Sequence, residues 1–445
     1  MNSDDSIAIG GSGPDLDGLS PQPPPAAPLP GAAQGTPPRR RRWLANAALV
    51  SASALFALLA LEGAMRLAPA LQLQTGDGEY RFCGAVQKRH QPHVAFGYTE
   101  YPGNSYFERY SALDPWAYVH INAEGFRDNM DNGGEPVFVL GDSLTRGTLV
   151  NEPENFSGLL ERWRQDFSFR TFGTGGYGQA NEIRLYDEKG KAAPHRLVIA
   201  QYSLSTDIDD NVERAQPSGP GVRIDIAPAI GTPRTEKKLV ARVHLFLWQN
   251  SKLYPWIYNA TVRPFVSNWD ARRDMAGALD VTRRLMVRLE EDVQANGADL
   301  LVLVLPSWAE MAGRDDGMAP EAQRAMLQRF VTDNPGVFLL DMTPILRRED
   351  PNRTYGRIDK HLTPYGHYLV ARALDRWLSR DWPRGPQTAP VAHPFPPPMT
   401  VTPRCDLAPE YQRPFTDLPR AMPRTPPSPA PLGAPAPPLA VGATA

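Results

Sequence analysis

The stretch Val137–Thr145 has the sequence VFVLGDSLT, in which a short apolar run stops at Gly141 and is followed at once by Asp142 and Ser143. The β-branched and aromatic residues of the run predict a buried strand. Open parallel sheets bind their ligands at the carboxyl ends of such strands. Gly141 permits a sharp turn, so Ser143 would begin a loop or a helix N-terminus whose N–H groups are free. We therefore expect the Ser143 hydroxyl to be placed for attack on a carbonyl carbon, with its own N–H group directed at the resulting oxyanion.

The chain beyond Ser143 alternates between helical and extended patterns. The spacing of apolar residues predicts helices over 156–163, 183–186, 275–293 and 326–331, and apolar runs predict strands over 167–172, 197–200, 300–305 and 337–340. This alternation is typical of an α/β domain with a parallel sheet and helices on both faces. Residues 205–272 interrupt the pattern and are expected to form an insertion near the site or the membrane.

The composition limits how much of the chain can form a core. The 445 residues include 47 prolines and 36 glycines, and the prolines are concentrated at the two ends. Residues 1–38 and the Pro/Ala-rich residues 386–445 hold few large apolar side chains, so both are predicted to be disordered tails. The rest suits one large domain at 133–385, preceded by a small, aromatic-rich lead-in at 75–132. The net charge of -2 provides no basic field for nucleic acid, and no zinc-type Cys/His spacing occurs. We expect no metal and no other cofactor.

A candidate membrane segment lies near the N-terminus. The cluster Arg39–Arg42 precedes Trp43–Leu61, a run of nineteen residues without a charge. This length just spans a hydrocarbon core, so we predict a single transmembrane helix within 39–68. The arginines are expected to stay in the cytoplasm, which places the rest of the chain on the extracytoplasmic side, in a periplasm or at the cell surface. A cleavable signal peptide with an Ala-x-Ala-like site at 68–70 is the alternative.

Two cysteines, Cys83 and Cys405, bracket the expected globular part. Export of this part would permit a disulfide between them. Such a bond would join the beginning of the Pro-rich tail to the segment that follows the membrane. Two unpaired thiols are the alternative, and the spacing does not decide between the two.

Gly141–Leu144, with the sequence GDSL, resembles the nucleophile block of the GDSL or SGNH hydrolases. Alone, the motif is equally typical of a Gly-Asp turn after a core strand, with Ser143 as a helix cap. Residues 121–128 resemble a stretch found just before this block in membrane-anchored members of the family. We assign that stretch no chemistry and expect a structural turn in which Arg127 pairs with a carboxylate.

The glycine-rich segment Gly173–Gly178 follows the second predicted strand and resembles the family's glycine block. The match implies that Gly176 provides the second backbone N–H of the oxyanion hole, where bare backbone fits closely against the substrate oxygen. The segment also satisfies the Gly-x-Gly-x-x-Gly dinucleotide spacing. The acidic ribose partner expected about 20 residues on is missing, because Leu197–Ser203 holds no carboxylate.

Members of the family carry an asparagine before the next aspartate, and its side chain is the third oxyanion donor. Alignment on Asp207 puts Thr206 at the asparagine position of this chain. Loss of one such donor costs about 2.7–4 kcal/mol of transition-state stabilisation. Thr206 could serve as a weaker substitute, or Asn211 could reach in instead. We interpret the aspartates around Asp207 as the acidic first turn of a helix, not as a metal site.

The last block is Asp359-Lys360-His361, just before a predicted helix with Thr363 as N-cap and Pro364 as first residue. Asp-x-His before a final helix is the family's signature. The resemblance implies that His361 takes the proton from Ser143 and that Asp359 orients the imidazole and supports its charge.

The resemblance covers about residues 121–378 and implies a three-layer α/β/α, flavodoxin-like SGNH domain behind a single transmembrane helix. It implies a serine esterase that hydrolyses acyl esters, in particular acetyl esters, on an envelope glycan or lipid through a Ser-His-Asp acyl-enzyme mechanism. An O-acyltransferase that modifies a cell-surface polysaccharide is the first alternative. A catalytically weak glycan-binding or assembly module is the second, because of Thr206. The expected partners are an acylated carbohydrate or lipid substrate and the membrane, and no nucleic acid.

Overall fold

The computed structural model describes most of the chain between the two tails. The described residues are 39–67, 78–110, 114–127, 133–226, 274–357 and 359–411, with a few positions between 243 and 257. The predicted N-terminal tail 1–38, residues 412–445 and most of the second half of the predicted insertion lie outside them. The chain divides into two compact units, Met1–Leu59 and Ala60–Ala445.

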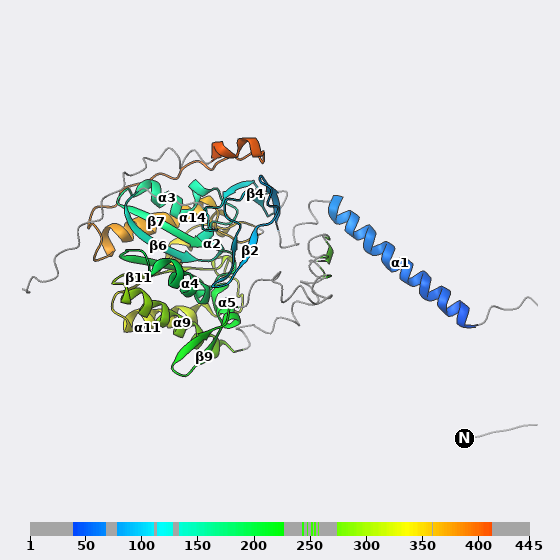
Figure 1. Cartoon of the computed structure of the whole chain (residues 1–445), viewed down its shortest axis with the longest axis horizontal. Coiled ribbons are helices and arrows are strands. Elements are labelled where there is room, and N and C mark those ends of the chain that lie inside the picture. Colours follow the sequence, from blue (N-terminus) through cyan, green and yellow to red (C-terminus); the bar gives the residue numbers. More distant parts are fainter. Residues whose placement is uncertain are drawn as a thin grey trace, which may run out of the picture. The chain divides into compact units, whose positions relative to one another are not determined.

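The predicted transmembrane segment lies in one continuous helix, α1 (Arg39–Leu67) (Figure 1). Within it, Asn46–Arg66 is a stretch of 21 residues with a mean hydropathy of 1.8, long and apolar enough to cross a membrane. At about 1.5 Å per residue this stretch is about 30 Å long, the thickness of a bilayer core. Large apolar side chains such as Leu49 and Phe56 are exposed along it, as expected for a helix that faces lipid.

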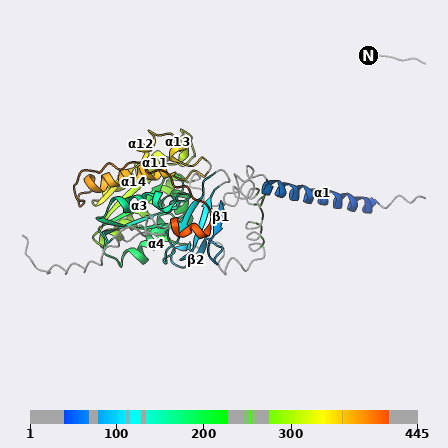
Figure 2. The same cartoon turned by 90° about the horizontal axis from the view of Figure 1, so that it is seen from above.

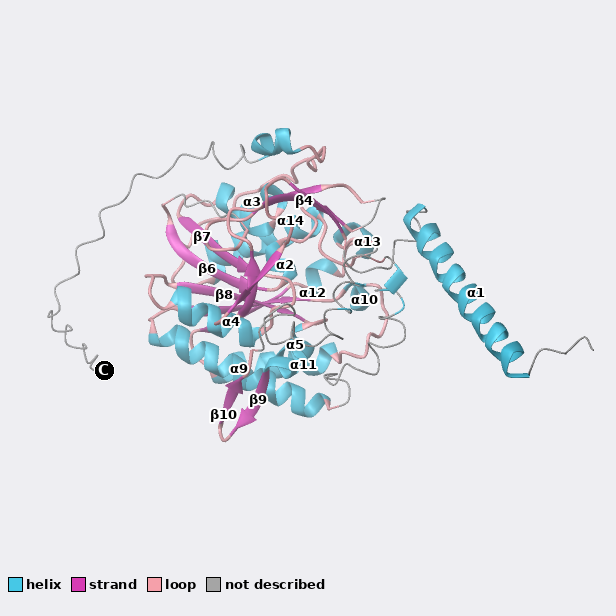
Figure 3. Cartoon of the chain, turned by 45° about the vertical axis from the view of Figure 1, so that its right-hand side comes forward, coloured by secondary structure: helices cyan, strands magenta, loops and turns pink. Residues whose placement is uncertain are grey.

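A five-stranded parallel sheet forms the centre of the domain (Figure 3). Its strands are β6 (Glu135–Gly141), β7 (Phe167–Gly173), β8 (Leu197–Ser203), β11 (Asp299–Leu305) and β12 (Val337–Asp341). They lie in the order β12-β11-β8-β6-β7, and every neighbouring pair is parallel. This is the flavodoxin-like order, and its direction reverses between β6 and β8, where doubly wound folds bind ligands. The predicted α/β class is confirmed.

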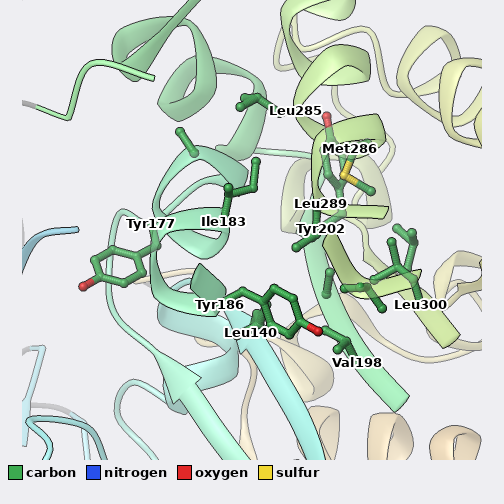
Figure 4. Packing of buried hydrophobic residues seen from close by; sticks show 14 of the residues in the cluster. Leu140, Tyr177, Ile183, Tyr186, Val198, Tyr202, Leu285, Met286, Leu289 and Leu300 are labelled. Carbon is green, nitrogen blue, oxygen red and sulfur yellow. The ribbon is translucent and has the colours of Figure 1, made fainter. Parts of the chain in front are cut away.

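Helices cover both faces of the sheet, which gives three layers (Figure 3). One face carries α4 (Gln179–Leu185), α9 (Met275–Ala295) and α11 (Pro320–Asp333), and the other carries α3 (Phe156–Trp163) and α14 (Pro364–Arg376). Each face of the sheet has its own hydrophobic core, and successive strand residues point to opposite faces. Leu300 therefore belongs to the core that includes α9, and Leu301 belongs to the core that includes α14. Figure 4 shows the first core, to which α9 contributes Leu285 and Leu289 and the sheet contributes Val198 and Leu300.

Short elements complete the domain. They are α2 (Ser143–Arg146), α5 (Asp207–Arg214), α10 (Trp308–Met311), α12 (Thr343–Leu346) and α13 (Pro351–Thr354). Glu152–Glu154 and Cys405–Leu407 form 3₁₀ helices, and Tyr186–Gly190 and Trp377–Asp381 form π-helices. The described beginning of the predicted insertion 205–272 consists of α5 and the hairpin β9 (Ala215–Ser218) and β10 (Gly221–Ile224). Ile208 of α5 packs with Ala278 of α9, so this part belongs to the body of the domain.

The lead-in is rich in strands. β1 (Glu79–Phe82), β4 (Ser105–Arg109) and β5 (Ala117–His120) form an antiparallel sheet, and β2 (His90–His93) pairs with β3 (Gly97–Glu100). Its aromatic side chains supply two small cores, one with Phe107 and Tyr118 and one with Tyr106 and Val119.

The prediction that residues 386–445 form a disordered tail is wrong for 386–411. Phe395 packs on Tyr365 of α14, and Val401 and Ala408 join the small core around Phe107. Cys405 is joined to Cys83 by a disulfide, and the segment around Cys405 lies beside the lead-in strands in both views (Figures 1 and 2). The amino-acid composition did not predict this arrangement. A few apolar residues, spaced by prolines, are enough to hold residues 386–411 as an extended strap on the surface of the domain.

Candidate active site

Ser143 lies where the sheet order reverses, directly after the carboxyl end of β6. Asp142 caps α2, and its Oδ1 atom accepts a hydrogen bond of 2.7 Å from the Leu144 N–H. A Cβ atom at Gly141 would overlap the Thr145 hydroxyl and the Gln201 side chain. Only glycine therefore allows the chain to turn this tightly from strand to helix, and as the first residue of α2, Ser143 has an N–H group without a partner in a preceding turn.

The structure brings the three predicted catalytic residues into hydrogen-bond contact. His361 Nε2 lies 2.8 Å from Ser143 Oγ, and His361 Nδ1 lies 3.2 Å from Asp359 Oδ2. The Asp359 side chain is 7% exposed and that of His361 is 27% exposed. A buried carboxylate behind a half-buried imidazole is the arrangement in which a histidine can accept a proton from a serine hydroxyl.

Local structure holds the loop that carries Asp359 and His361. The Thr363 hydroxyl accepts a hydrogen bond of 3.2 Å from the Gly366 N–H, so it caps α14 as predicted. The His361 carbonyl accepts a hydrogen bond of 2.8 Å from the Gly356 N–H. Lys360, between the two catalytic candidates, adopts the left-handed conformation with φ of 63°, and its two neighbours meet through the contact of Asp359 Oδ2 with His361 Nδ1.

The Lys360 side chain makes a contact that sequence reasoning missed. Its ammonium lies over the ring of Trp308, 3.3 Å from the ring centroid. Trp308 begins α10, directly after β11. A cation over an indole face is attracted by the ring quadrupole, so this contact ties the loop that carries Asp359 and His361 to the end of a central strand. The only signal in the sequence is the position of Trp308 at a strand end.

A cavity of about 280 Å³ opens beside Ser143. The ends of β6, β8 and β11 and the loop 355–361 contribute its walls, with Thr206, Trp308 and His361 among the lining residues. The volume is just below the usual range of about 300–1,000 Å³ for pockets that hold a small molecule. It therefore suits a small acyl group with part of its alcohol.

Gly176, the predicted second oxyanion donor, lies in the glycine block beside Ser143 but outside the cavity lining. The Gly175 carbonyl accepts a hydrogen bond of 2.5 Å from the Tyr98 hydroxyl. In a trans peptide the N–H group points opposite to the carbonyl, so the Gly176 N–H is directed away from Tyr98. A Cβ atom at Gly175 would lie 3.7 Å from Ser143 Cβ, which shows how closely bare backbone approaches the nucleophile candidate.

Thr206 lines the cavity as predicted, but its hydroxyl donates to Asp142 Oδ2 at 3.3 Å. The alternative donor Asn211 is buried and does not line the cavity; its Nδ2 atom donates to Gln179 Oε1 at 2.7 Å and to Thr282 Oγ1 at 3.2 Å. The idea that Asn211 reaches into the site is therefore wrong. The aspartates around Asp207 do lie in the first turn of α5, and no group of side chains among the described residues could hold a metal ion.

Buried carboxyl groups lie behind the nucleophile candidate. Burial raises the pKa of Asp142, although the Leu144 N–H and the Thr206 hydroxyl stabilise its charged form. Burial and the nearby charge of Asp142 also raise the pKa of Glu182 and Asp207 well above the usual range. Gln201 Oε1 accepts hydrogen bonds of 3.1 Å from the Asp142 N–H and the Thr145 hydroxyl, which anchors the turn to β8. These contacts join residues far apart in sequence, and no sequence motif predicted them.

Arg127 was predicted to pair with a carboxylate, and this is confirmed. Its guanidinium forms a buried ion pair of 2.5 Å with Glu152 and donates to the carbonyls of Arg146, Gly147, Tyr118 and Val150. Arg127 thus ties the carbonyl end of α2 to the lead-in strand β5. The residue holds the nucleophile helix in place and does not line the cavity.

Comparison with known proteins adds a family match. Residues 259–408 match the family model described as "SGNH hydrolase-like domain, acetyltransferase AlgX". No curated protein matches the chain. Among solved structures, a lipolytic protein of the G-D-S-L family from Veillonella parvula is 11% identical, with a TM-score of 0.35, and the match covers 56% of this chain and 100% of that one. The acetylxylan esterase Axe2 from Geobacillus stearothermophilus is 12% identical, with a TM-score of 0.35 and coverage of 55% and 93%. A two-domain esterase active on acetylated mannans is 14% identical, with a TM-score of 0.33 and coverage of 60% and 54%.

The matched segment contains Asp359, His361 and α14, and the parallel sheet has the order expected for the family. Residues 259–408 of this chain are therefore similar to an SGNH hydrolase-like domain.

Proposed function

We propose that this domain is a serine esterase in which Ser143 attacks an acyl ester and forms an acyl-enzyme. The contact that carries the proposal is the hydrogen bond of 2.8 Å between Ser143 Oγ and His361 Nε2, at the edge of a cavity. Asp359 supports it from the other side of the ring, 3.2 Å from His361 Nδ1. A serine hydroxyl beside an imidazole that a carboxylate orients is the arrangement used for acyl transfer on several unrelated folds.

The reaction follows from the tautomer that Asp359 selects. With Nδ1–H donating to Asp359, the Nε2 atom of His361 is free to accept the Ser143 proton as Oγ attacks the ester carbonyl. The tetrahedral intermediate then collapses, and the same nitrogen returns the proton to the leaving alcohol. Water, deprotonated by His361, releases the acyl group and restores Ser143. The backbone N–H groups of Ser143 and Gly176 are the proposed donors to the oxyanion.

The proposed substrate is an acyl ester, in particular an acetyl ester, on an envelope glycan or lipid. The cavity of about 280 Å³ has room for a short acyl chain and part of a sugar ring, but little more. The description of the matched family names an acetyltransferase, which supports an acetyl group as the acyl unit.

O-acetyl transfer to a polysaccharide is a second candidate, and the family match favours it directly. Both reactions share the Ser143 acyl-enzyme. They differ only in whether a sugar hydroxyl or water attacks it. Whether hydrolysis or transfer occurs therefore depends on which acceptor, water or a sugar hydroxyl, reaches the Ser143 side of the cavity. Both reactions can be tested with the same protein.

We further propose that the N-terminus is cytoplasmic and that the domain lies outside the cytoplasm. The apolar stretch Asn46–Arg66 follows the arginine cluster 39–42, and positive residues stay on the cytoplasmic side of a membrane helix. The disulfide between Cys83 and Cys405 suits an oxidising compartment. Alkaline phosphatase fused after residue 411 should be active in a bacterial host, whereas alkaline phosphatase fused before residue 39 should be inactive. The reverse result would contradict the orientation.

The test of the enzyme proposal uses the purified chain and p-nitrophenyl acetate. Wild type should release p-nitrophenol and react with a fluorophosphonate at Ser143, and Ser143→Ala should do neither. Addition of acetylated and free sugar oligomers then separates the two candidates, because transfer produces newly acetylated oligomers by mass spectrometry and hydrolysis produces only acetate. A wild-type protein that neither turns over the ester nor is labelled would refute both.

A further inference from the structure

We infer that Ser205 supplies the side-chain hydrogen bond of the oxyanion hole and that Ser203 orients it. The sequence puts Thr206 where the family has its asparagine donor, but the hydrogen bonds of the cavity point to the serine one residue earlier. This inference rests on the proposed function, since it assigns a donor to the oxyanion that forms when Ser143 attacks an ester. It extends that function by naming a further catalytic residue.

The first step is to follow the hydroxyl protons around the cavity. Besides Ser143, five residues with hydroxyl groups line it. Three of them donate to acceptors within the chain: Thr206 to Asp142 Oδ2 at 3.3 Å, Ser307 to Asp316 Oδ2 at 2.8 Å, and Tyr355 to the Pro306 carbonyl at 2.5 Å. A hydroxyl has a single proton to donate. These three groups therefore have none left for a substrate oxygen.

The remaining two hydroxyls belong to Ser203 and Ser205, whose Oγ atoms lie 2.9 Å apart. The hydrogen bond between them uses one proton of the two, so one proton has no partner among the described residues. Ser203 is 1% exposed, whereas Ser205 is half-buried and borders the cavity. The arrangement favours donation from Ser203 to Ser205, which leaves the Ser205 proton for the substrate. A hydroxyl that accepts one hydrogen bond also becomes a better donor of the next.

The register of the sheet places this pair beside Ser143. Leu140 of β6 is paired with Ala200 of β8, so Ser143 and Ser203 each come three residues after a paired position on neighbouring strands. Neighbouring strands lie about 4.8 Å apart. The Asp142 N–H donates to Gln201 Oε1 at 3.1 Å. The segment after β6 is therefore still adjacent to β8 one residue before Ser143. Ser143, Ser203 and Ser205 therefore meet at the same end of the sheet.

Lys360 is the competing donor, because it also lines the cavity and an ammonium carries three protons. Its ammonium donates to the Arg357 carbonyl and lies over the Trp308 ring. These contacts hold the ammonium against Trp308 at the beginning of α10. The experiment therefore includes Lys360 as a separate arm.

The test compares five variants in ester hydrolysis, with Lys360→Met as the arm for the competing donor. Ser205→Ala should lower kcat about 10²- to 10³-fold with little change in KM, as expected for a donor that acts mainly in the transition state. Ser205→Thr keeps a hydroxyl and should retain most of the activity. Ser203→Ala and Thr206→Val each remove one supporting hydrogen bond and should cost about fivefold. The melting temperature of each variant shows whether it is folded.

The outcomes separate this inference from the proposed function. If wild type is active and Ser205→Ala stays within about threefold of it, the assignment of Ser205 is overturned. A large loss in Thr206→Val or Lys360→Met with an unimpaired Ser205→Ala overturns it too and names the true donor. Failure of Ser205→Ala to fold leaves Ser205→Thr and Ser203→Ala to decide. Wild type that lacks both turnover and labelling of Ser143 refutes the enzyme proposal itself.

Discussion

Arg146, three residues after Ser143, donates hydrogen bonds to both oxygens of the Glu108 carboxylate, at 2.9 and 3.1 Å. Both side chains are 1% exposed. Glu108 belongs to β4, so this fork joins the lead-in to the helix that carries the nucleophile candidate. Burial by itself would raise the pKa of Glu108, but the charge of Arg146 overcomes it and lowers the pKa to about 2. Arg146 also pairs with the buried Glu100 of β3, so loss of Glu108 would leave the buried guanidinium with one carboxylate partner in place of two.

Replacement of Glu108 by glutamine should reduce the free energy of unfolding by about 1.5–3 kcal/mol at neutral pH, because Arg146 would lose one of its two buried carboxylate partners and keep only Glu100. The folded pKa of Glu108 lies below its unfolded value of 4.5. The stabilisation is therefore complete above about pH 5 and is lost as the pH falls toward 2. Urea unfolding of wild type and Glu108→Gln at pH 7 and pH 4 measures the change. The difference between the two proteins should shrink at the lower pH.

The matched control is Glu79→Gln, since Glu79 also pairs with an arginine of β4. Its partner is Arg109, at 2.6 Å, but the two side chains are 32% and 20% exposed. Ion pairs open to solvent contribute about 0–1 kcal/mol. Equal losses in Glu108→Gln and Glu79→Gln would contradict the view that the buried pair holds the lead-in on α2.

Asp359→Asn should lower kcat by about 10⁴-fold while Ser143 and His361 stay in place. An asparagine amide can donate to His361 Nδ1, which favours the tautomer with the proton on Nε2 and removes the base that Ser143 needs. Steady-state hydrolysis of p-nitrophenyl acetate gives the change in kcat. Asp333→Asn, an equal substitution at an exposed position of α11, should leave it unaltered. Retention of activity by Asp359→Asn would show that another group orients His361.

Lys360→Met should lower kcat about two- to fivefold. The variant loses the interaction between the cation and the Trp308 ring, which contributes about 0.5–1 kcal/mol to holding the loop with Asp359 and His361 in place. Lys360→Arg keeps a cation for the indole face and should stay close to wild type. The two variants are compared in the same ester assay, with the melting temperature as a check on folding. Equal activity of Lys360→Met and wild type would mean that the loop is held by backbone contacts such as Gly356 N–H to the His361 carbonyl.

The sequence predicted the elements of the sheet because its strands are short apolar runs that end at or just before glycine, serine, proline or aspartate. Ser143, Asp359 and His361 were selected for a related reason, since the blocks of the family that they resemble consist of three or four adjacent residues. The contacts of Gln201, Glu108 and Ser205 could not be found in this way. Each contact depends on which side chains, distant in sequence, the fold brings together. Hydrogen bonds between such side chains produce no periodic pattern in the sequence. Thr206 was selected from alignment with the family, and only the hydrogen bond to Asp142 shows where its proton is used.

Reduction of the disulfide between Cys83 and Cys405 should destabilise the protein without loss of ester hydrolysis at room temperature. The bond closes a separation of 322 residues. Cross-links stabilise mainly by restricting the unfolded chain, typically by about 2–4 kcal/mol. No cavity-lining residue comes from the lead-in or from the strap 386–411, so the site should keep its geometry while the domain is folded. The melting temperature of wild type, with and without dithiothreitol, measures the effect.

Cys405→Ser and Cys83→Ser should each reproduce the shift and become insensitive to the reductant, and the double variant should add nothing further. Strap contacts that do not involve the disulfide, such as Tyr411 against Phe107 and Tyr118, are present in every variant. They explain why the strap can remain docked after reduction and why activity should survive. If reduction left the melting temperature unchanged, those apolar contacts alone would hold the strap, and the disulfide would contribute nothing to stability.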